Sequence, residues 1–318
     1  MTDPLSPFQR YFCLLDEQPY YLVPPRLMAP ESVDSLIVNP RCWFSWRGAV
    51  PPKLATSVRA AADFLQADCM VWVPDSQTGA VWPYWVGYDF IEYVDTLVPG
   101  FAVPANLPLP LRWVLAKAEI LVPPDRPERK RWQWDYESRF LQQQFRGGFA
   151  ALFHPIPPFH VGALRRYYRQ NIRSGALTLG DDQVERRYVS HNEQVARFLN
   201  LQLVNTISTV VNRRVKASYA YVAAYQGGAV LERHTDREQC EYTVSICVDA
   251  SPAPMGRCQW PINLDTMGGT LRVFQQIGEG LLFRGRKIAH HRDRLVAGSS
   301  VTSVLLHYVD SQFAGALD

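Results

Sequence analysis

The chain has 318 residues, of which 47% are hydrophobic and 20% are charged, and its formal net charge at pH 7 is +3. This length and hydrophobic content suffice for one large domain or two smaller ones with buried cores. A net charge this small gives no indication of a nucleic-acid-binding surface. No run of about 18 apolar residues occurs, so the sequence predicts no transmembrane helix and no membrane partner.

The six cysteines are scattered along the chain without a Cys-x-x-Cys spacing. Neither a zinc knuckle nor a dense disulfide framework is therefore indicated. The first residues contain no basic segment followed by an apolar stretch, which a secretory signal would require. We expect a cytoplasmic protein with reduced thiols.

Proline and tryptophan divide the chain in two. Of its 24 prolines 21 precede residue 160, and eight of its nine tryptophans precede residue 135. Because proline interrupts helices and central strands, residues 1–150 are predicted to be an irregular N-terminal region, separate from residues 151–318. Aromatic residues are frequent where proteins bind ligands, so we expect this region to shape a substrate pocket or to dock a partner protein.

The expected elements of the first half are few. They are a helix at 54–66, a strand at 69–73, an apolar helix or strand at 111–121, and a solvated loop at 124–134 that enters a helix. The cations and tryptophans of this last segment could stack on nucleic-acid bases. Asp125 and Glu128 within the segment favour the loop.

Beyond residue 160 the pattern becomes regular. A helix is predicted at 161–174, with Gly175 as its C-cap, and a second at 192–210, with Asn192 as a possible N-cap. Strand patterns follow at 218–225, 242–248, 281–284 and 301–309. The helices are expected to buttress the sheet that these strands form.

The triplet His234-Thr235-Asp236 and the later pair His290-His291 suggest a metal site. Side chains alternate between the two faces of a strand, so His234 and Asp236 share a face, whereas His290 and His291 point in opposite directions. Two imidazoles and one carboxylate on one side of an iron ion leave its other side open. The alternative for an isolated triplet is a surface turn with a hydrogen-bonded aspartate.

The spacing of Tyr225, Gly227, His234, Asp236, His290 and Gly298 resembles that of the iron(II)- and 2-oxoglutarate-dependent oxygenases, in particular their prolyl-hydroxylase-like branch. The resemblance covers residues 150–310. It implies an α+β protein with a C-terminal double-stranded β-helix, or jelly-roll, barrel buttressed by helices. It also implies that His234, Asp236 and His290 hold iron(II), and that 2-oxoglutarate and O₂ are co-substrates. The distance from His290 to Gly298 favours His290 over His291 as the ligand.

The activity that this resemblance implies is a dioxygenase reaction in which 2-oxoglutarate is converted to succinate and carbon dioxide. Its substrate would be an unactivated C–H bond of an amino acid, a peptide or a natural product, and hydroxylation is the first expectation. Desaturation and ring formation stay open. Asp236 disfavours halogenation, because halogenating relatives replace this carboxylate with a small residue. Nucleic-acid demethylation ranks below these reactions.

One departure concerns the cation that binds the distal carboxylate of 2-oxoglutarate. Relatives carry it two residues after the position of Gly298, where this chain has Ser300; Thr302 still offers the hydroxyl expected beside it. Arg292 is the first candidate to replace the cation, because it lies on the same strand face as His290. Arg286 and Arg272 are the next candidates. The alternative is that Arg292 pairs with Asp293 or Glu279 at the surface.

Several other polar residues have two interpretations. Tyr221 and Tyr225 could donate hydrogen bonds to 2-oxoglutarate or could be core aromatics. His307 is expected to be a structural histidine, and Arg187 and His191 could reach the mouth of the site. Two rival functions stay open: a non-oxidative metal-dependent enzyme, and a non-catalytic binding module on the same barrel.

Overall fold

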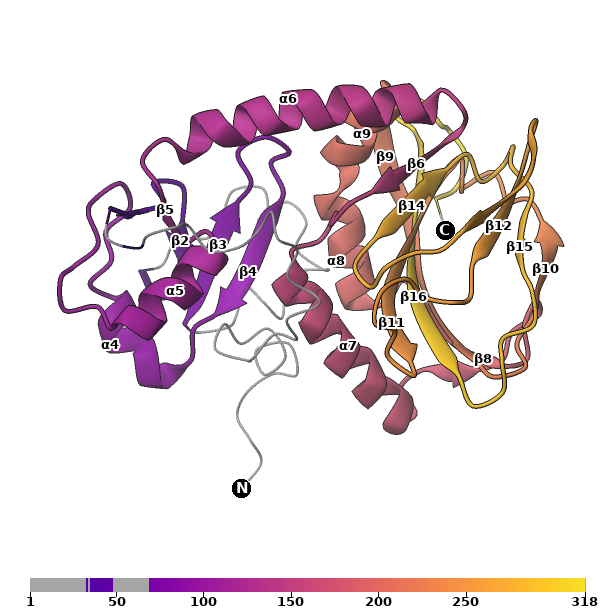
Figure 1. The fold of residues 1–318 in the computed structure, drawn as a ribbon, viewed down its shortest axis with the longest axis horizontal. Coiled ribbons are helices and arrows are strands. Elements are labelled where there is room, and N and C mark those ends of the chain that lie inside the picture. The colour runs from indigo at the N-terminus through magenta and orange to yellow at the C-terminus, as the bar shows by residue number, and fades with distance from the viewer. Residues whose placement is uncertain (1–32, 34, 48–68, 318) are drawn as a thin grey trace. The chain divides into compact units, whose positions relative to one another are not determined.

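The computed structural model describes residue 33 and residues 35–47 and 69–317, so the helix predicted at 54–66 lies outside the described residues. The chain divides into two compact units (Figure 1). The first comprises residues 1–135 and 158–163, and the second comprises residues 136–157 and 164–318. The predicted boundary at residue 150 falls within a strand of the second unit. Among the described residues, no helix has both the length and the apolar character needed to cross a membrane.

The first unit contains two small antiparallel sheets, one with strand order β2-β3-β4 and one that pairs β1 with β5. Its core includes the fully buried Met70, Trp72 and Leu115. The strand predicted at 69–73 is β3, and the apolar segment at 111–121 is α5 followed by β5. The elements are β1 Ile37–Val38, β2 Trp43–Phe44, η3 Ser45–Arg47, β3 Met70–Pro74, β4 Val81–Trp85, η4 Tyr88–Phe90, α4 Ile91–Val94, α5 Leu109–Lys117 and β5 Leu121–Val122.

Helix α6, Arg126–Phe145, follows these elements. The loop predicted at 124–134 is therefore wrong for most of its length. An ion pair across one helical turn, between Arg129 and Asp125 at 2.5 Å, supports the first turns of this helix.

The second unit combines helices with a large antiparallel sheet, as the sequence predicts. Its seven-stranded sheet has the order β6-β14-β11-β16-β9-β8-β7, and a four-stranded sheet has the order β10-β15-β12-β13. The elements after α6 are β6 Phe149–Leu152, α7 Pro158–Arg173, β7 Thr178–Leu179, β8 Arg187–His191, α8 Gln194–Gln202, α9 Val204–Val211, β9 Val215–Gln226, β10 Leu231–His234, β11 Tyr242–Ser251, β12 Ile262–Thr266, β13 Gly269–Val273, β14 Gly280–Phe283, β15 His290–Arg292 and β16 Ser300–Asp310.

The predicted helix at 161–174 is α7. It ends at Arg173, and its C-cap is Ser174 instead of the predicted Gly175, which follows the cap with the positive φ of 73° that is common just beyond a helix. The helix predicted at 192–210 is two helices, α8 and α9, which meet at Leu203.

The N-cap predicted at Asn192 is wrong. Glu193 caps α8, because its carboxylate accepts hydrogen bonds from the backbone N–H groups of Val195 and Ala196. Asn192 instead accepts a hydrogen bond from the backbone N–H of Ala220.

The two faces of the large sheet have different neighbours. Helices α8 and α9 pack against β9, and α8 also packs against β16 (Figure 1). Tyr308 of β16 donates a hydrogen bond to the backbone oxygen of Asn200 in α8. From β9, β11 and β16, alternate residues on the opposite face line a cavity; these are Tyr219, Tyr221, Tyr225, Thr243, Ser245, Ser303, Leu305 and His307. The period of two along each strand thus determines which side chains reach the site.

Candidate metal centre

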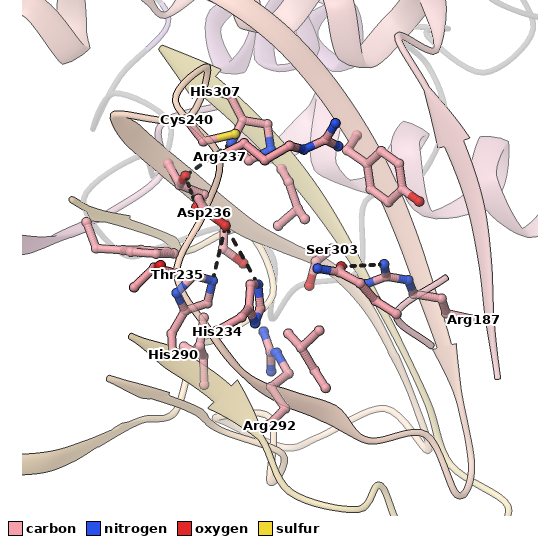
Figure 2. Close-up of a pocket in the computed structure, with 18 of the residues that line it drawn as sticks. Arg187, His234, Thr235, Asp236, Arg237, Cys240, His290, Arg292, Ser303 and His307 are labelled. Atoms are coloured by element: carbon pink, nitrogen blue, oxygen red, sulfur yellow. Dashed lines mark hydrogen bonds and ion pairs between the residues drawn. The ribbon is translucent and has the colours of Figure 1, made fainter. Parts of the chain in front are cut away.

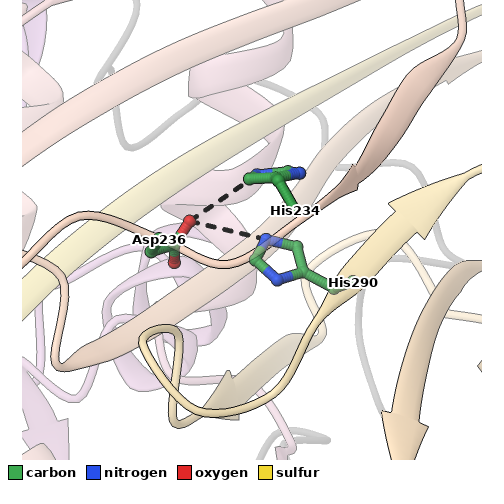
Figure 3. A group of neighbouring side chains, drawn as sticks. All are labelled: His234, Asp236 and His290. Carbon is green, nitrogen blue, oxygen red and sulfur yellow. Dashed lines mark ion pairs between the residues drawn. The ribbon is translucent and has the colours of Figure 1, made fainter.

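His234, Asp236 and His290 come together at one side of this cavity (Figure 3). His234 is the last residue of β10, and His290 is the first residue of β15, which pairs with β10 in antiparallel register. Asp236 lies just beyond β10, where its backbone N–H donates to the carbonyl of Gly285. The pairing of β10 with β15 therefore brings the two histidines together, and the turn after β10 adds the carboxylate.

The ligand atoms of the three residues are spaced as a metal ion requires. Asp236 Oδ1 lies 3.7 Å from His234 Nε2 and 3.5 Å from His290 Nε2. These separations are long for hydrogen bonds. Two metal–ligand bonds of about 2.1 Å span up to about 4 Å, so an ion fits between each pair. All three ligand atoms lie within 4.8 Å of one another.

Both histidines are held in the tautomer that binds metal. His234 Nδ1 lies 2.8 Å from the carbonyl oxygen of Glu232, and His290 Nδ1 lies 3.1 Å from that of Ile288. A carbonyl oxygen only accepts hydrogen bonds, so Nδ1 carries the proton and Nε2 offers its lone pair. Burial also lowers the pKa of His290, although Asp236 opposes this effect. His290 is therefore neutral at pH 7, as a metal ligand must be.

The second oxygen of Asp236 is also fixed. Asp236 Oδ2 accepts a hydrogen bond of 2.6 Å from Thr243 Oγ1, which also lies 3.1 Å from His307 Nδ1. Gly285 packs closely against this carboxylate. A Cβ atom at position 285 would overlap Asp236 Oδ2 and would lie only 2.6 Å from Thr243 Oγ1. Glycine is therefore required where the turn after β14 meets the carboxylate.

A second group of possible ligands, Asp236, Cys240 and His307, shares the same carboxylate. Burial raises the pKa of Cys240 to about 12, so its sulfur stays protonated at neutral pH. That sulfur also lies 3.0 Å from the hydroxyl of Tyr219. Because metals bind the thiolate form of cysteine, the group with two histidines fits an ion better.

The cavity beside the three ligands has a volume of about 430 Å³ (Figure 2). Both sheets contribute to its walls. The lining includes the metal group, Tyr219, Tyr221, Tyr225, Arg187, Arg237, Arg292, Ser245, Ser303 and His307. A small organic molecule can thus lie against the open side of the metal group.

Arg292 lines this cavity and is only 4% exposed. Its Nη1 donates to the carbonyl oxygen of Trp260 at 2.9 Å, and its guanidinium lies 4.6 Å from the centroid of the Trp260 ring. Burial lowers the pKa of this arginine. Within the described residues, no carboxylate pairs with it to offset this effect. The expected alternative, a surface pair with Asp293 or Glu279, is wrong.

The acids of that alternative have other partners. Glu279 binds Arg257 at 2.9 Å, and Asp293 accepts a hydrogen bond from Asn263 at 3.3 Å. Arg272 and Arg286 are exposed and do not line the cavity. Arg292 is thus the one of the three candidate arginines that faces the site.

Ser300 and Thr302 lie on the opposite face of β16 from the cavity, so the structure does not place them among its lining residues. Ser303 lines the cavity instead, and so does Ser245 of β11. The Oγ atoms of Ser245 and Ser303 are buried and have no hydrogen-bond partner within the described protein. The sequence reasoning missed both hydroxyls. The alternation along β16, counted from His307, was the signal that would have found Ser303.

Tyr221 and Tyr225 both line the cavity, but only one has a free proton to donate. Tyr221 Oη donates to Asp181 at 2.6 Å. Tyr225 Oη accepts a hydrogen bond from Arg187 at 3.1 Å, so its own proton stays available. Arg187 is buried and reaches the cavity as one interpretation expected, and it pairs with Asp181 at 2.5 Å. His191 does not line the cavity.

Comparison with known proteins gives structural matches alone. No protein-family model matches the chain, and no curated protein matches it significantly. Among solved structures, the prolyl-4-hydroxylase of Pseudomonas putida matches 54% of this chain and 98% of its own length, with 15% identity and a TM-score of 0.43. A prolyl hydroxylase of Trichoplax adhaerens, in complex with a peptide fragment of hypoxia inducible factor, matches 57% of this chain and 94% of its own, with 16% identity and a TM-score of 0.46.

HygX of Streptomyces hygroscopicus, with nickel and 2-oxoglutarate bound, matches 55% of this chain and 88% of its own length, with 14% identity and a TM-score of 0.44. Further matches are the non-heme α-ketoglutarate-dependent epimerase SnoN and carbocyclase SnoK from nogalamycin biosynthesis, and an oxidoreductase of the 2OG-Fe(II) oxygenase family from Burkholderia pseudomallei.

Proposed function

We propose that this protein is an iron(II)- and 2-oxoglutarate-dependent dioxygenase that oxidises an unactivated C–H bond, with hydroxylation as the expected outcome. The observation that carries this proposal is the pairing of two features in one cavity. A group of two histidines and one carboxylate presents three ligand atoms on one side. A buried arginine, without a carboxylate partner in the described protein, lines the same cavity.

His234, Asp236 and His290 would hold the iron. Their neutral imidazoles and single carboxylate suit iron(II) in an open site. When bound, iron and 2-oxoglutarate supply the oxidising chemistry, in which O₂ is consumed and succinate and carbon dioxide are formed. The protein has to fix both groups, exclude bulk water from them and place the substrate C–H bond.

Arg292 would pair with the distal carboxylate of 2-oxoglutarate. A carboxylate buried without a cation is very costly, and so is a buried guanidinium without an anion. Each would therefore offset the desolvation of the other. The planar guanidinium also offers two parallel N–H groups to a carboxylate. In the family, the cation that binds this carboxylate stands at the position of Ser300. Here Arg292 of β15 would take its role.

Three hydroxyl groups would complete the co-substrate site. Tyr225 has a proton to donate, and the buried hydroxyls of Ser245 and Ser303 lack partners. Buried polar groups of folded proteins are almost always satisfied, so these serines point to a polar ligand in the cavity. Tyr221 is less suited, because its proton is already bonded to Asp181.

In this proposal the second unit is a double-stranded β-helix. The four-stranded sheet β10-β15-β12-β13 and the seven-stranded sheet would be the two walls of its barrel, with the iron held between them. The substrate would be an amino acid, a peptide or a natural product that enters the cavity. Residues 1–150 would help to shape the substrate pocket or dock a protein partner. A chain without residues 1–135 that turns over its substrate as fast as the full chain would discard this last role.

The test is an anaerobic titration of the apo protein with iron(II) and then with 2-oxoglutarate. A bidentate complex of a keto acid with iron(II) gives a weak visible charge-transfer band. We expect this band in the wild type and its loss in His234→Ala. An absence of the band despite tightly bound metal would refute the proposal, and a non-oxidative metal enzyme or a binding module would then explain the site.

A further inference from the structure

Two cysteines lie close together behind the proposed co-substrate site. Cys247 of β11 is 2% exposed, Cys258 is 5% exposed, and both are free thiols. Their backbones are held by one short segment. Cys247 N–H donates to Glu279 at 3.1 Å and its carbonyl accepts from Gly278 at 2.7 Å, while Cys258 N–H donates to Gln275 at 2.7 Å. Residues 275–279 therefore hold the two cysteines side by side.

The two thiols influence each other and differ in acidity. The hydrogen bond between them is the largest cause of both pKa shifts: it raises the pKa of Cys247, together with burial, and lowers that of Cys258. Against the opposing effect of burial, the pKa of Cys258 falls to about 6, and the nearby Arg292 contributes to this fall. Cys258 is thus the more nucleophilic sulfur, and Cys247 is the protonated one.

Cys258 is also linked to Arg292. The sulfur of Cys258 lies 4.0 Å from the carbonyl oxygen of Trp260, and Arg292 Nη1 donates to the same oxygen at 2.9 Å. The Trp260 ring packs on the guanidinium of Arg292 and on Tyr225. A displacement of the segment from Cys258 to Trp260 therefore moves both partners of Arg292.

We propose that Cys247 and Cys258 form a redox-sensitive dithiol, which a hydroperoxide converts to a disulfide that weakens the binding of 2-oxoglutarate at Arg292. Formation of the disulfide would follow from the shared backbone partners of the two cysteines and from their burial, whereas its effect on 2-oxoglutarate rests on the function proposed above. The Cys258 thiolate attacks the peroxide, and the resulting sulfenic acid condenses with the Cys247 thiol and releases water. In sum, both thiols lose a proton and an electron, and hydrogen peroxide is reduced to water.

The chain that precedes Cys258 is exposed to solvent. Pro252, Met255 and Arg257 are exposed, so the segment that leads to Cys258 runs along the surface. A disulfide requires Cα atoms within about 7 Å and a defined torsion of the S–S bond. Both cysteines are already bonded through their backbones to residues 275–279, so a local adjustment of this surface segment would bring the sulfurs into line. Such an adjustment would act directly on Trp260.

The experiment treats the full-length apo protein with hydrogen peroxide, removes the oxidant and maps disulfides by mass spectrometry of unreduced peptides. We expect a Cys247–Cys258 link in the wild type and in Cys69→Ser, which removes another buried thiol. We expect no such link in Cys247→Ser or Cys258→Ser. If no Cys247–Cys258 peptide forms, or if links to other cysteines dominate, the proposal is overturned. The mapping in the wild type decides this point even if a variant fails to fold.

The second measurement is the anaerobic titration with iron(II) and 2-oxoglutarate on reduced and oxidised samples. Oxidation should raise the Kd of 2-oxoglutarate about tenfold, the loss expected when one charge-assisted hydrogen bond is displaced. Dithiothreitol should restore the affinity, and oxidation should leave that of Cys258→Ala unchanged. A linked protein with unaltered affinity would overturn the effect on binding. If the reduced protein does not bind 2-oxoglutarate at all, the proposed function fails, while the peptide map still decides whether the disulfide forms.

Discussion

Replacement of Arg292 by glutamine tests the proposed co-substrate site most directly. The change keeps a polar side chain of similar length but removes the charge and the paired N–H groups. Breaking a buried ion pair by removal of one partner costs about 3 kcal/mol or more, because the other charge is left unpaired. We therefore expect the Kd of 2-oxoglutarate to rise by at least about 150-fold, since each 1.4 kcal/mol is about a factor of ten.

The same change should have little effect on the apo protein and on metal binding. It removes the hydrogen bond to Trp260 and the contact of the guanidinium with the Trp260 ring, which together stabilise the fold. The buried charge of Arg292 has no carboxylate partner in the described protein and therefore destabilises the fold. Its removal should for this reason stabilise the apo protein. These effects oppose each other, so the urea midpoint should shift only slightly. Iron affinity should be unchanged, because His234, Asp236 and His290 are intact.

The assay is the anaerobic charge-transfer titration, with iron(II) affinity and the urea midpoint measured on the same samples. Arg272→Gln is the matched control, since Arg272 is exposed and lies outside the cavity. An unaltered Kd of 2-oxoglutarate in Arg292→Gln would remove Arg292 from this role. A large loss of stability with normal affinity would show that the arginine is structural.

Three further predictions concern residues around the metal group. Gly285→Ala should displace the Asp236 carboxylate and lower iron(II) affinity by about 10- to 100-fold, as measured by competition with a chelator; normal affinity would show that the turn adapts to a methyl group. Ser303→Val should weaken 2-oxoglutarate binding severalfold by loss of one hydrogen bond, without lowering the urea midpoint of the apo protein, because the hydroxyl has no partner there. Burial lowers the pKa of His307 from its ordinary value of 6.5 to about 4. As the pH falls, the unfolded chain therefore takes up a proton on this histidine before the folded protein does. The free energy of unfolding should thus decrease as the pH falls from about 6.5 toward 4. The loss should reach about 3 kcal/mol, and urea unfolding of His307→Gln without metal should show a correspondingly shallower pH dependence than the wild type.

Local patterns predicted much of the second unit. The β-branched run at 301–309 is β16, and α7 ends within two residues of the predicted Gly175. The proposed metal ligands come from two segments that are distant in sequence, His234 and Asp236 in one and His290 in the other, and they come together in the structure because β10 pairs with β15. The position of Arg292 also followed from strand alternation, since it lies two residues from His290.

Errors arose where the result depended on tertiary contacts. Ser300 and Thr302 were selected by their distance from Gly298, but the face of β16 that meets the cavity is set by its pairing with β9 and β11. The cap of α8 moved from Asn192 to Glu193, because Asn192 bonds to the neighbouring strand β9. No local pattern distinguishes the unpartnered hydroxyl of Ser245 from that of any other buried serine, because only the packing around it shows that it lacks a partner.

The short strand β15 has a consequence for how iron and 2-oxoglutarate affect each other's affinity. It contains both His290, which would hold iron, and Arg292, which would hold the co-substrate, and it lies between β10 and β12. The two anchors are separated by two residues, or about 7 Å of strand. Whichever ligand binds first immobilises the anchor of the other, so each should bind more tightly when the other is present. Because such linkage is reciprocal, the factor by which iron tightens the binding of 2-oxoglutarate must equal the factor by which 2-oxoglutarate tightens the binding of iron.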